Sequence, residues 1–426
     1  MKIAILLPYK ENFSPEYPGA VSLFVNATSE KSKYKKEIIV FGNTNFKRKF
    51  KIKYININLL KNPLSSQTRK YVNNFAYIQK KYKFSIIEVH NRPSYIIQLK
   101  KKIPTHVFSL FFHNDPLSMD GSKTVEERKK LLKICYKIIF NSNWSKKRFL
   151  EGLENKFVNS HKLVVFYQSA KKSSLTTLDK KKNWITFVGK LNRAKGYDIF
   201  AKSIKNILNR YPNWKAKIIG DEKREKISLE HKNADLMGFL NHEQVLNIFK
   251  KTSIAVACSR WEEPFGRTSL EASSRGCAVI ISNRGGLPET ITNGIIVRNL
   301  NVKNIYDAIN KLIINKRMRN NLQHLSIKNF YLTDEHISNK IDTYRNKILK
   351  NKLNFIYKKR NLEHLKILHV TNFNERHNGR LFYNTGKRIN NGFLRLNHSV
   401  LEFSDRDIVS YYRNVNDLNG SKRLNS

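Results

Sequence analysis

The stretch "SRWEEPFGRTSLEASSRGCAVIISNRGGLPE", residues 259–289, decides the fold class of this chain. A loop containing Pro264 and Gly266 leads into a helix-like segment, and an apolar, strand-like run follows that segment. Helix and strand in alternation are typical of a parallel sheet in an α/β domain. The eight-residue spacing of Glu263 and Glu271, one before the helix and one on its second turn, lets both carboxylates face one cleft.

Similar apolar runs recur along the chain. The first part contains "KIAILLP", "EIIVFG", "SIIEVH", "HVFSLFFH", "KIIFNS" and "KLVVFY", and the second part contains "WITFVG", "KAKIIGD", "SIAVACS" and "AVIISN". Helix-length segments separate many of them, so we predict an α/β protein with two parallel-sheet domains. The first domain would span residues 1–170 and the second residues 184–350, with a polar linker at 171–183 and a closing helix at 327–350.

The C-terminal part begins the same layout again. Residues 366–403 repeat the order of residues 2–41, with an apolar strand, a polar loop, a helix and a second strand. One such unit leaves both faces of its sheet open. We therefore interpret residues 351–426 as an incomplete start of a further Rossmann-like domain, which either docks on the body or belongs to a longer protein.

The charge of the chain is strongly positive, with 80 Lys and Arg against 33 Asp and Glu and a formal net charge of +47. Such an excess is compatible with contact to nucleic acid or to an anionic membrane surface. The charge is diffuse, however, and Lys, Asn and Ile are abundant throughout, as an AT-rich genome would impose. We expect no specific nucleic-acid partner, and the charge allows peripheral contact with an anionic membrane.

The cysteines and the apolar segments bear on location. Cys135, Cys258 and Cys277 are spaced neither as a disulfide framework nor as a metal site, which fits a reducing, cytoplasmic setting. No segment approaches the roughly 18 apolar residues of a membrane span. The N-terminal apolar run is too short for a signal peptide.

Two local patterns in the second domain suggest binding of an anion. In "FVGKLNRAKGYDIF" (187–200), Lys190, Arg193 and Lys195 follow a strand, where cations are placed to hold a diphosphate. A solvated basic loop is the alternative for so basic a chain. The backbone amides of residues 265–269 would form an anion site at a helix N-terminus, while carboxylates accept hydrogen bonds from paired sugar hydroxyls.

The order of these motifs resembles a known family. "GKL…KG", "GD", "GFL", "EEPFG…LEA…G" and "RGGLPE…NG" are similar to the C-terminal domain of family 4 glycosyltransferases with the GT-B fold. In the first domain, "PYKENFSPEYPGAVS", "VHNRP" and "FFHND" resemble the family's glycine-containing loop, a strand end and its histidine loop. The resemblance spans residues 1 to about 350 and implies the GT-B arrangement, in which two Rossmann-like domains face a central cleft.

The resemblance implies roles for individual residues. Glu271 would bind the ribose hydroxyls of a nucleotide sugar, and Glu263 would contact hydroxyls of the transferred sugar. Lys195, with Lys190, would neutralise the diphosphate. The family commonly has Arg where this chain has Lys190, and lysine lacks the bidentate fork of arginine, so Arg193 is a candidate to assist.

Further implied site residues come from three loops. Gly19 would let the first loop approach the phosphates, although the family's frequent double glycine is Gly19 followed by Ala20 here. His113 would lie near the donor sugar, with a purely structural histidine as the alternative. Phe265 and Gly266 would present the amides of the anion site.

The resemblance implies a retaining glycosyltransferase that needs no metal and no other cofactor. It would use a nucleotide sugar and a glycan or lipid-linked acceptor, in cell-surface polysaccharide or lipopolysaccharide synthesis at the cytoplasmic side of the membrane. Two alternatives stay open: a nucleotide-sugar epimerase on the same fold, and a non-catalytic polyanion-binding protein. The sequence does not identify the sugar, the base or the acceptor.

Overall fold

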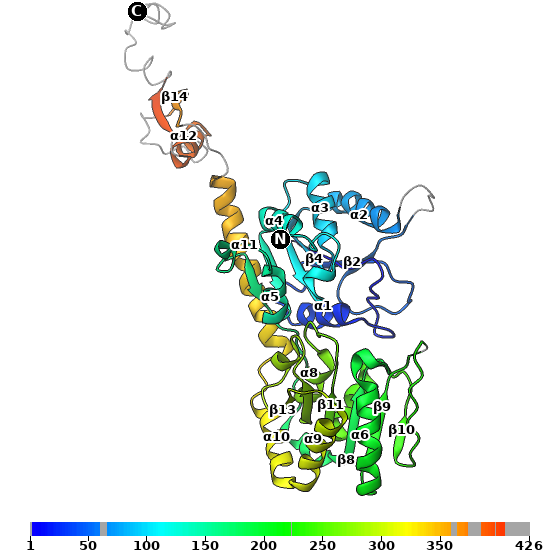
Figure 1. Ribbon diagram of the computed structural model, residues 1–426. Coiled ribbons are helices and arrows are strands. Elements are labelled where there is room, and N and C mark those ends of the chain that lie inside the picture. Colours follow the sequence, from blue (N-terminus) through cyan, green and yellow to red (C-terminus); the bar gives the residue numbers. More distant parts are fainter. Residues whose placement is uncertain are drawn as a thin grey trace, which may run out of the picture. The chain divides into compact units, whose positions relative to one another are not determined.

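The computed structural model of the chain describes residues 2–59, 66–222, 224–358, 364–373, 385–396 and 398–404. The chain divides into two compact units, residues 1–346 and 347–426. The first unit contains two parallel sheets, each accompanied by its own set of helices (Figure 1).

The first sheet has seven strands in the order β3-β2-β1-β4-β5-β6-β7, and all neighbours are parallel. The strands are β1 (Lys2–Leu6), β2 (Ile38–Gly42), β3 (Tyr54–Asn56), β4 (Phe84–His90), β5 (Phe108–Phe112), β6 (Lys137–Phe140) and β7 (Leu163–Val165). The α-helices along this part of the chain are α1 (Ala20–Glu30), α2 (Gln67–Ile78), α3 (Pro93–Lys102), α4 (Val125–Ile134) and α5 (Asn143–Leu150).

The second sheet has six parallel strands in the order β10-β9-β8-β11-β12-β13. These are β8 (Lys182–Val188), β9 (Lys215–Ile219), β10 (Ala234–Leu236), β11 (Thr252–Ala257), β12 (Ala278–Ser282) and β13 (Gly294–Val297). The accompanying helices are α6 (Tyr197–Arg210), α7 (His242–Lys251), α8 (Arg267–Ser274), α9 (Val302–Ile314) and α10 (Lys316–Lys328).

Burial explains why the strands read as apolar runs. β2, β5 and β12 are buried along their whole length, as expected for strands whose two faces are both covered. The predicted α/β class with two parallel sheets is therefore confirmed. The structure adds β3 and β13, short edge strands that the sequence analysis did not predict.

Two predicted segments differ in their limits. The linker contains a 3-10 helix, η4 (Leu175–Lys180), and its last residues already belong to β8. The closing helix, α11 (Asp334–Lys358), begins seven residues later than the predicted residue 327, because α10 continues to Lys328. The sheets themselves occupy residues 2–165 and 182–297, and the domain limits stay predictions.

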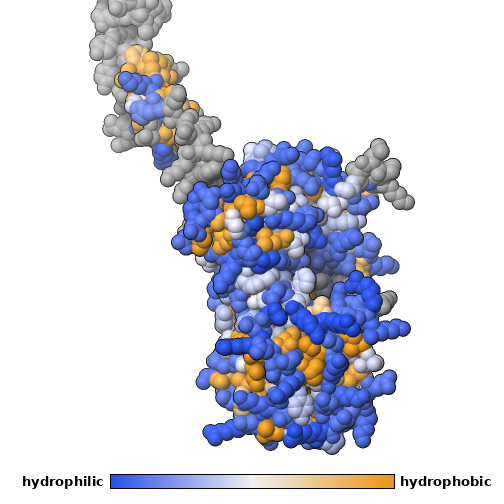
Figure 2. Space-filling view, in the orientation of Figure 1, coloured by the Kyte–Doolittle hydropathy of each residue, from blue (hydrophilic) through white to orange (hydrophobic). Residues whose placement is uncertain are grey.

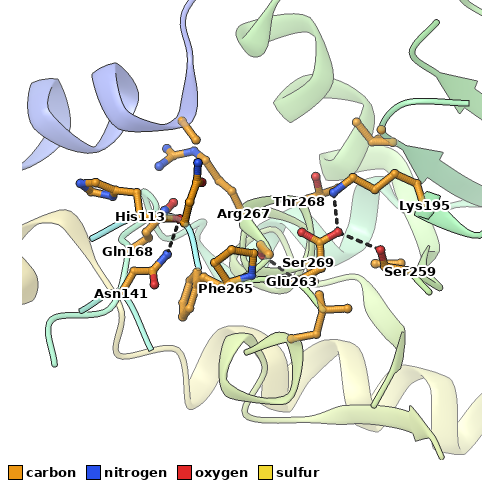
Figure 3. Close-up of a pocket in the computed structure, with 18 of the residues that line it drawn as sticks. His113, Asn141, Gln168, Lys195, Ser259, Glu263, Phe265, Arg267, Thr268 and Ser269 are labelled. Atoms are coloured by element: carbon orange, nitrogen blue, oxygen red, sulfur yellow. Dashed lines mark hydrogen bonds and ion pairs between the residues drawn. The ribbon is translucent and has the colours of Figure 1, made fainter. Parts of the chain in front are cut away.

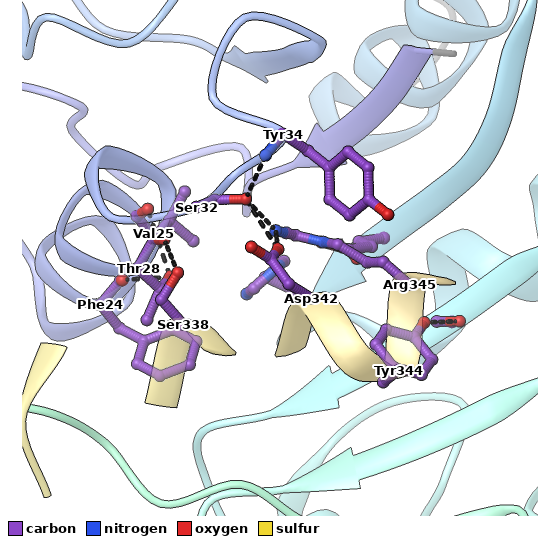
Figure 4. A network of polar contacts seen from close by, with 12 residues as sticks. Phe24, Val25, Thr28, Ser32, Tyr34, Ser338, Asp342, Tyr344 and Arg345 are labelled. Carbon is purple, nitrogen blue, oxygen red and sulfur yellow. Dashed lines mark hydrogen bonds and ion pairs between the residues drawn. The ribbon is translucent and has the colours of Figure 1, made fainter. Parts of the chain in front are cut away.

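Helix α11 packs back on the first domain through buried polar contacts (Figure 4). Arg345 donates from Nε and Nη2 to the two carboxylate oxygens of Glu88 on β4, at 2.9 and 2.7 Å. Its Nη1 lies 3.2 Å from Oδ1 of Asp342, which also accepts a hydrogen bond of 2.7 Å from the Ser32 hydroxyl after α1. Ser338 donates to the Thr28 carbonyl. The chain thus returns from the second domain to brace the first.

The second unit contains β14 (Lys366–Val370), α12 (Thr385–Arg395) and β15 (Ser399–Phe403). The two strands pair in parallel, so the strand, helix and strand expected in residues 366–403 are present. Residues 374–384 of the repeat and the tail from residue 405 lie outside the described residues.

Hydrophilic side chains cover most of the visible face of the molecule, with smaller apolar patches between them (Figure 2). Among the described residues, no helix combines the length and the apolar character that a membrane crossing requires.

We predict that Arg345→Met destabilises the protein by about 3–5 kcal/mol, because it leaves the carboxylates of Glu88 and Asp342 buried without their cation. Denaturation in urea measures this loss. The matched control is Lys31→Met, which removes an ion pair between Lys31 and Glu335 that is about half exposed at both side chains and should matter much less. Equal losses in the two variants would contradict the bracing role.

Candidate active site

The topology of each sheet marks where a ligand should bind. Strand order reverses between β1 and β4 in the first sheet and between β8 and β11 in the second. Ligands of doubly wound sheets bind outside the carboxyl ends of the strands at such points. The loops after β8 and β11 carry Lys195 and Glu263, and the loop after β5 carries His113.

A cavity of about 250 Å³ is lined from both domains (Figure 3). The first domain and the segment after β7 contribute Ala20, His113, Asn114, Asn141 and Gln168. The second domain contributes mainly the residues after β8 and β11, including Gly189, Lys195, Ser259, Glu263 and residues 264–269. Figure 3 shows His113, Asn141 and Gln168 on one side and Lys195 and Ser259 on the other.

Glu263 and Lys195 form an ion pair in this cavity. The same carboxylate oxygen, Oε1, accepts a hydrogen bond of 2.9 Å from the Ser259 hydroxyl. The backbone carbonyl of Glu263 accepts a bond of 2.6 Å from the Gly286 amide. The structure therefore brings together two predicted site residues that are 68 positions apart, and it holds the carboxylate in a fixed position.

Helix α8 begins at the same cavity. Gly266 precedes it with φ of 107°, and a Cβ there would overlap the Leu287 side chain, so this position requires glycine. Within the described part of the chain, the amides of Arg267, Thr268 and Ser269 form no hydrogen bond. These are the free donors at the positive end of a helix dipole, where an anion is favoured. Residues 265–269, which were predicted to supply the amides, all line the cavity.

His113 is buried beside the cavity. Its Nε2 lies 3.0 Å from Nδ1 of His90, and its amide donates to the side-chain oxygen of Asn91 at 3.1 Å. Burial, reinforced by the charge of Arg267, lowers the pKa of His113 to about 3. The imidazole is therefore neutral near pH 7, and it can act as a hydrogen-bonding group but not as a cation.

Glu271 differs from the expectation that both glutamates face one cavity. It is buried on the second turn of α8 and is not among the residues that line this cavity. Its Oε1 accepts from Nε2 of His242 at 2.7 Å and lies 2.7 Å from Nε of Arg267. Burial opposes its ionisation, but Arg267 and His242 outweigh burial and hold the pKa of Glu271 below the usual value.

Three further expectations need correction or refinement. Lys190 is exposed and does not line the cavity. Arg193, the candidate to assist it, has a side chain that is 77% exposed and pairs with Glu225 at 3.2 Å, and it does not line the cavity either. A Cβ on Gly19 would overlap the Glu11 carboxylate, which caps α1 by accepting from the Ser22 amide at 2.8 Å. A side chain at position 19 would therefore displace the Glu11 carboxylate, and Ala20 is the residue that reaches the cavity.

Sequence reasoning missed several polar residues of the site. Arg267 lines the cavity, and so do Asn141 and Gln168. Asn141 directly follows β6, and a polar residue at the carboxyl end of a predicted strand was the available signal. Four buried atoms of these lining residues have no hydrogen-bond partner among the described residues. They are Nδ1 of His113, Oε1 of Gln168, and Nε and Nη1 of Arg267. These atoms are open to hydrogen bonds from water or from a polar ligand in the cavity.

The two halves of the cavity are joined by contacts at the start of α5. The Ser142 hydroxyl donates to the Pro264 carbonyl at 2.6 Å. Glu289, in the 3-10 helix η6 (Leu287–Thr290), accepts from the amides of Asn143 and Trp144 at 2.7 and 2.9 Å. Asn141 donates to the His113 carbonyl at 2.9 Å. The histidine loop and the loop of Glu263 are therefore linked through one helix end.

The described residues include no group of three or more His, Cys, Asp or Glu arranged to hold a metal ion. The three cysteines are buried, with free thiols.

The comparisons with known proteins agree with this geometry. Residues 169–328 match the family model of glycosyl transferases group 1. Spore coat protein SA of Bacillus subtilis (strain 168) is 25% identical over 355 residues, which cover 76% of this chain and 92% of that protein. The putative glycosyltransferase YtcC of the same organism is 24% identical over 302 residues, covering 62% of this chain and 73% of that protein.

The crystal structure of Anabaena HepE in complex with UDP-glucose aligns with a TM-score of 0.62 at 16% identity, covering 83% of this chain and 100% of that chain. At such identity, the likeness supports the fold. Residues 169–328 therefore match the group 1 glycosyl transferases, and the chain is a glycosyltransferase of the GT-B fold.

Proposed function

We propose that this glycosyltransferase takes a sugar from a nucleotide-sugar donor and transfers it to a glycan or lipid-linked acceptor. The observation that carries the proposal is the cavity itself, which sets the free amides of α8, Lys195 and Glu263 opposite His113 of the other domain. Cationic and dipolar groups at a helix N-terminus suit a diphosphate. The carboxylate and the neutral imidazole suit sugar hydroxyls.

Different residues of the site would bind different parts of the donor. The diphosphate would lie against the α8 amides and Lys195, and Glu263 would accept hydrogen bonds from the transferred sugar. Both contacts of the Glu271 carboxylate with His242 and Arg267 involve Oε1. Its other oxygen, Oε2, would accept a hydrogen bond from a ribose hydroxyl. UDP and UDP-glucose are held by the Anabaena HepE structures, which supports a nucleotide sugar as the donor class here.

We further propose that transfer retains the anomeric configuration and needs no metal ion. As the bond from the anomeric carbon to the phosphate oxygen breaks, its electron pair leaves with the diphosphate. The acceptor hydroxyl forms the new bond on the same face, and its proton passes to the departing phosphate. Lys195 and the α8 amides stabilise the growing negative charge, which is the step where fixed dipoles contribute most.

We propose that the protein acts in the cytoplasm, at the inner face of the membrane. The transfer would be a step in the synthesis of a cell-surface polysaccharide or lipopolysaccharide. The excess of Lys and Arg supports contact with anionic lipids.

A panel of UDP-, GDP- and ADP-sugars tests the proposed function. We expect one nucleotide class to bind and to be hydrolysed slowly without acceptor, at the same rate with and without EDTA. Loss of activity in EDTA would contradict the metal-independent mechanism. Binding only to polyanions, abolished by salt, would replace the proposal with the polyanion-binding alternative.

We predict that Glu271→Gln weakens nucleoside-diphosphate binding about ten- to a hundred-fold, because a charged hydrogen-bonding partner contributes about 1.5–3 kcal/mol. Isothermal titration of both proteins measures the change. The matched control, Glu225→Gln, removes a carboxylate of the same domain that pairs with the exposed Arg193, and it should leave the affinity unchanged. Unchanged affinity in Glu271→Gln would disprove the ribose role.

A further inference from the structure

Arg267 occupies an unusual position for a cation. It is the first residue of α8, at the positive end of the helix dipole, where a positive charge is disfavoured. Only 14% of its side chain is exposed, and it lines the cavity between the domains. A partly buried arginine at this end of a helix is electrostatically unfavourable unless a negative group compensates its charge.

The hydrogen bonding of Arg267 is incomplete. Its Nε lies 2.7 Å from Oε1 of Glu271 as an ion pair, yet neither Nε nor Nη1 makes a hydrogen bond among the described residues. Arg345, also buried, shows the contrast, because its Nε, Nη1 and Nη2 all donate to neighbouring groups. A guanidinium has five N–H donors, and buried donors without partners are costly.

The surroundings show where these donors lie. In Figure 3 the Arg267 side chain reaches toward the side of the cavity that holds His113 and Gln168, away from Lys195. The positive charge of Arg267 acts together with burial to lower the pKa of His113. Lys195 already has a counter-charge in Glu263, and both Lys190 and Arg193 lie outside the lining. Arg267 is thus the only arginine that lines this cavity in the described part of the chain.

We propose that Arg267 is a substrate-binding residue that holds an anionic oxygen group of the bound donor. This inference rests on the proposed function, since it takes the cavity as the donor site. Two oxygen groups have the required chemistry: the diphosphate, or a carboxylate on the transferred sugar. A planar fork that binds two oxygens at once recognises either of them, and binding would satisfy the donors that the protein leaves open.

The experiment is a titration of UMP, UDP, UDP-glucose and UDP-glucuronate, or of the matching guanosine or adenosine series if the donor panel selects that base. It compares wild type with Arg267→Met and Arg267→Lys. The lysine variant keeps a cation beside Glu271 and serves if the methionine variant does not fold. Arg193→Met, which removes the exposed arginine outside the cavity, is the control and should bind every ligand as wild type does.

Two results would support the proposal. If Arg267 binds the diphosphate, Arg267→Met weakens UDP and both UDP-sugars about ten- to a hundred-fold and UMP much less. If it binds a sugar carboxylate, only UDP-glucuronate loses affinity, and wild type prefers it to UDP-glucose. In either case Arg267→Lys recovers part of the loss, since it restores charge without the fork.

Two results would overturn it. Unchanged affinities for all four ligands would mean that Arg267 does not touch the donor. An equal loss for UMP and UDP, with no additional loss for the acidic sugar, would mean that Arg267 acts only by holding Glu271 for the ribose. Failure of the proposed function is distinguishable, because wild type would then bind none of the nucleotides.

Discussion

The candidate site depends on the contact between Glu289 and the first turn of helix α5. Glu289 belongs to the second domain, and it accepts the amides of Asn143 and Trp144 in the first domain. The Ser142 side chain accepts the third free amide, from Ser145, and donates to the carbonyl of Pro264. Two open donors of this helix are thereby satisfied across the domain boundary, and its N-cap serine bonds across the same boundary to Pro264, which fixes the loop of Glu263 against the domain of His113.

This contact explains why the cavity is assembled from two sheets. Each sheet alone offers a switch point with polar loops, but neither holds all the groups of the proposed donor site. The second domain supplies the charges and the helix dipole, and the first supplies the buried imidazole. Helix α11 adds a second contact with the first domain through Arg345 and Glu88 on β4.

The sequence predicted those elements of the fold that follow from the spacing of apolar residues. Apolar runs located both sheets, and the pattern of Pro264 and Gly266 located the start of α8 to within two residues. The edge strands β3 and β13, of three and four residues, were too short to stand out from loops. The pairing of Lys195 with Glu263 was not predicted either, although both residues were assigned to the site.

Side-chain directions accounted for the other differences. Spacing alone did not reveal that Arg193 turns toward Glu225, that Glu11 fills the space beside Gly19, or that Arg267 and His242 hold Glu271. These outcomes depend on rotamers and on neighbours that are distant in the sequence. Because the chain contains many arginines, the sequence alone did not single out Arg267 as a site residue. Its burial in the structure does.

The most direct measurement compares Glu289→Ala with Glu127→Ala, a variant that removes the capping carboxylate of α4 within the first domain. All proposed ligands of the nucleoside diphosphate lie in the second domain, so its affinity should stay within about twofold of wild type in both variants. Sugar transfer should fall by about tenfold or more in Glu289→Ala alone, because misplacing reacting groups by about 1 Å can cost a hundred-fold in rate. Equal turnover in Glu289→Ala and wild type would contradict the claim that this contact assembles the site.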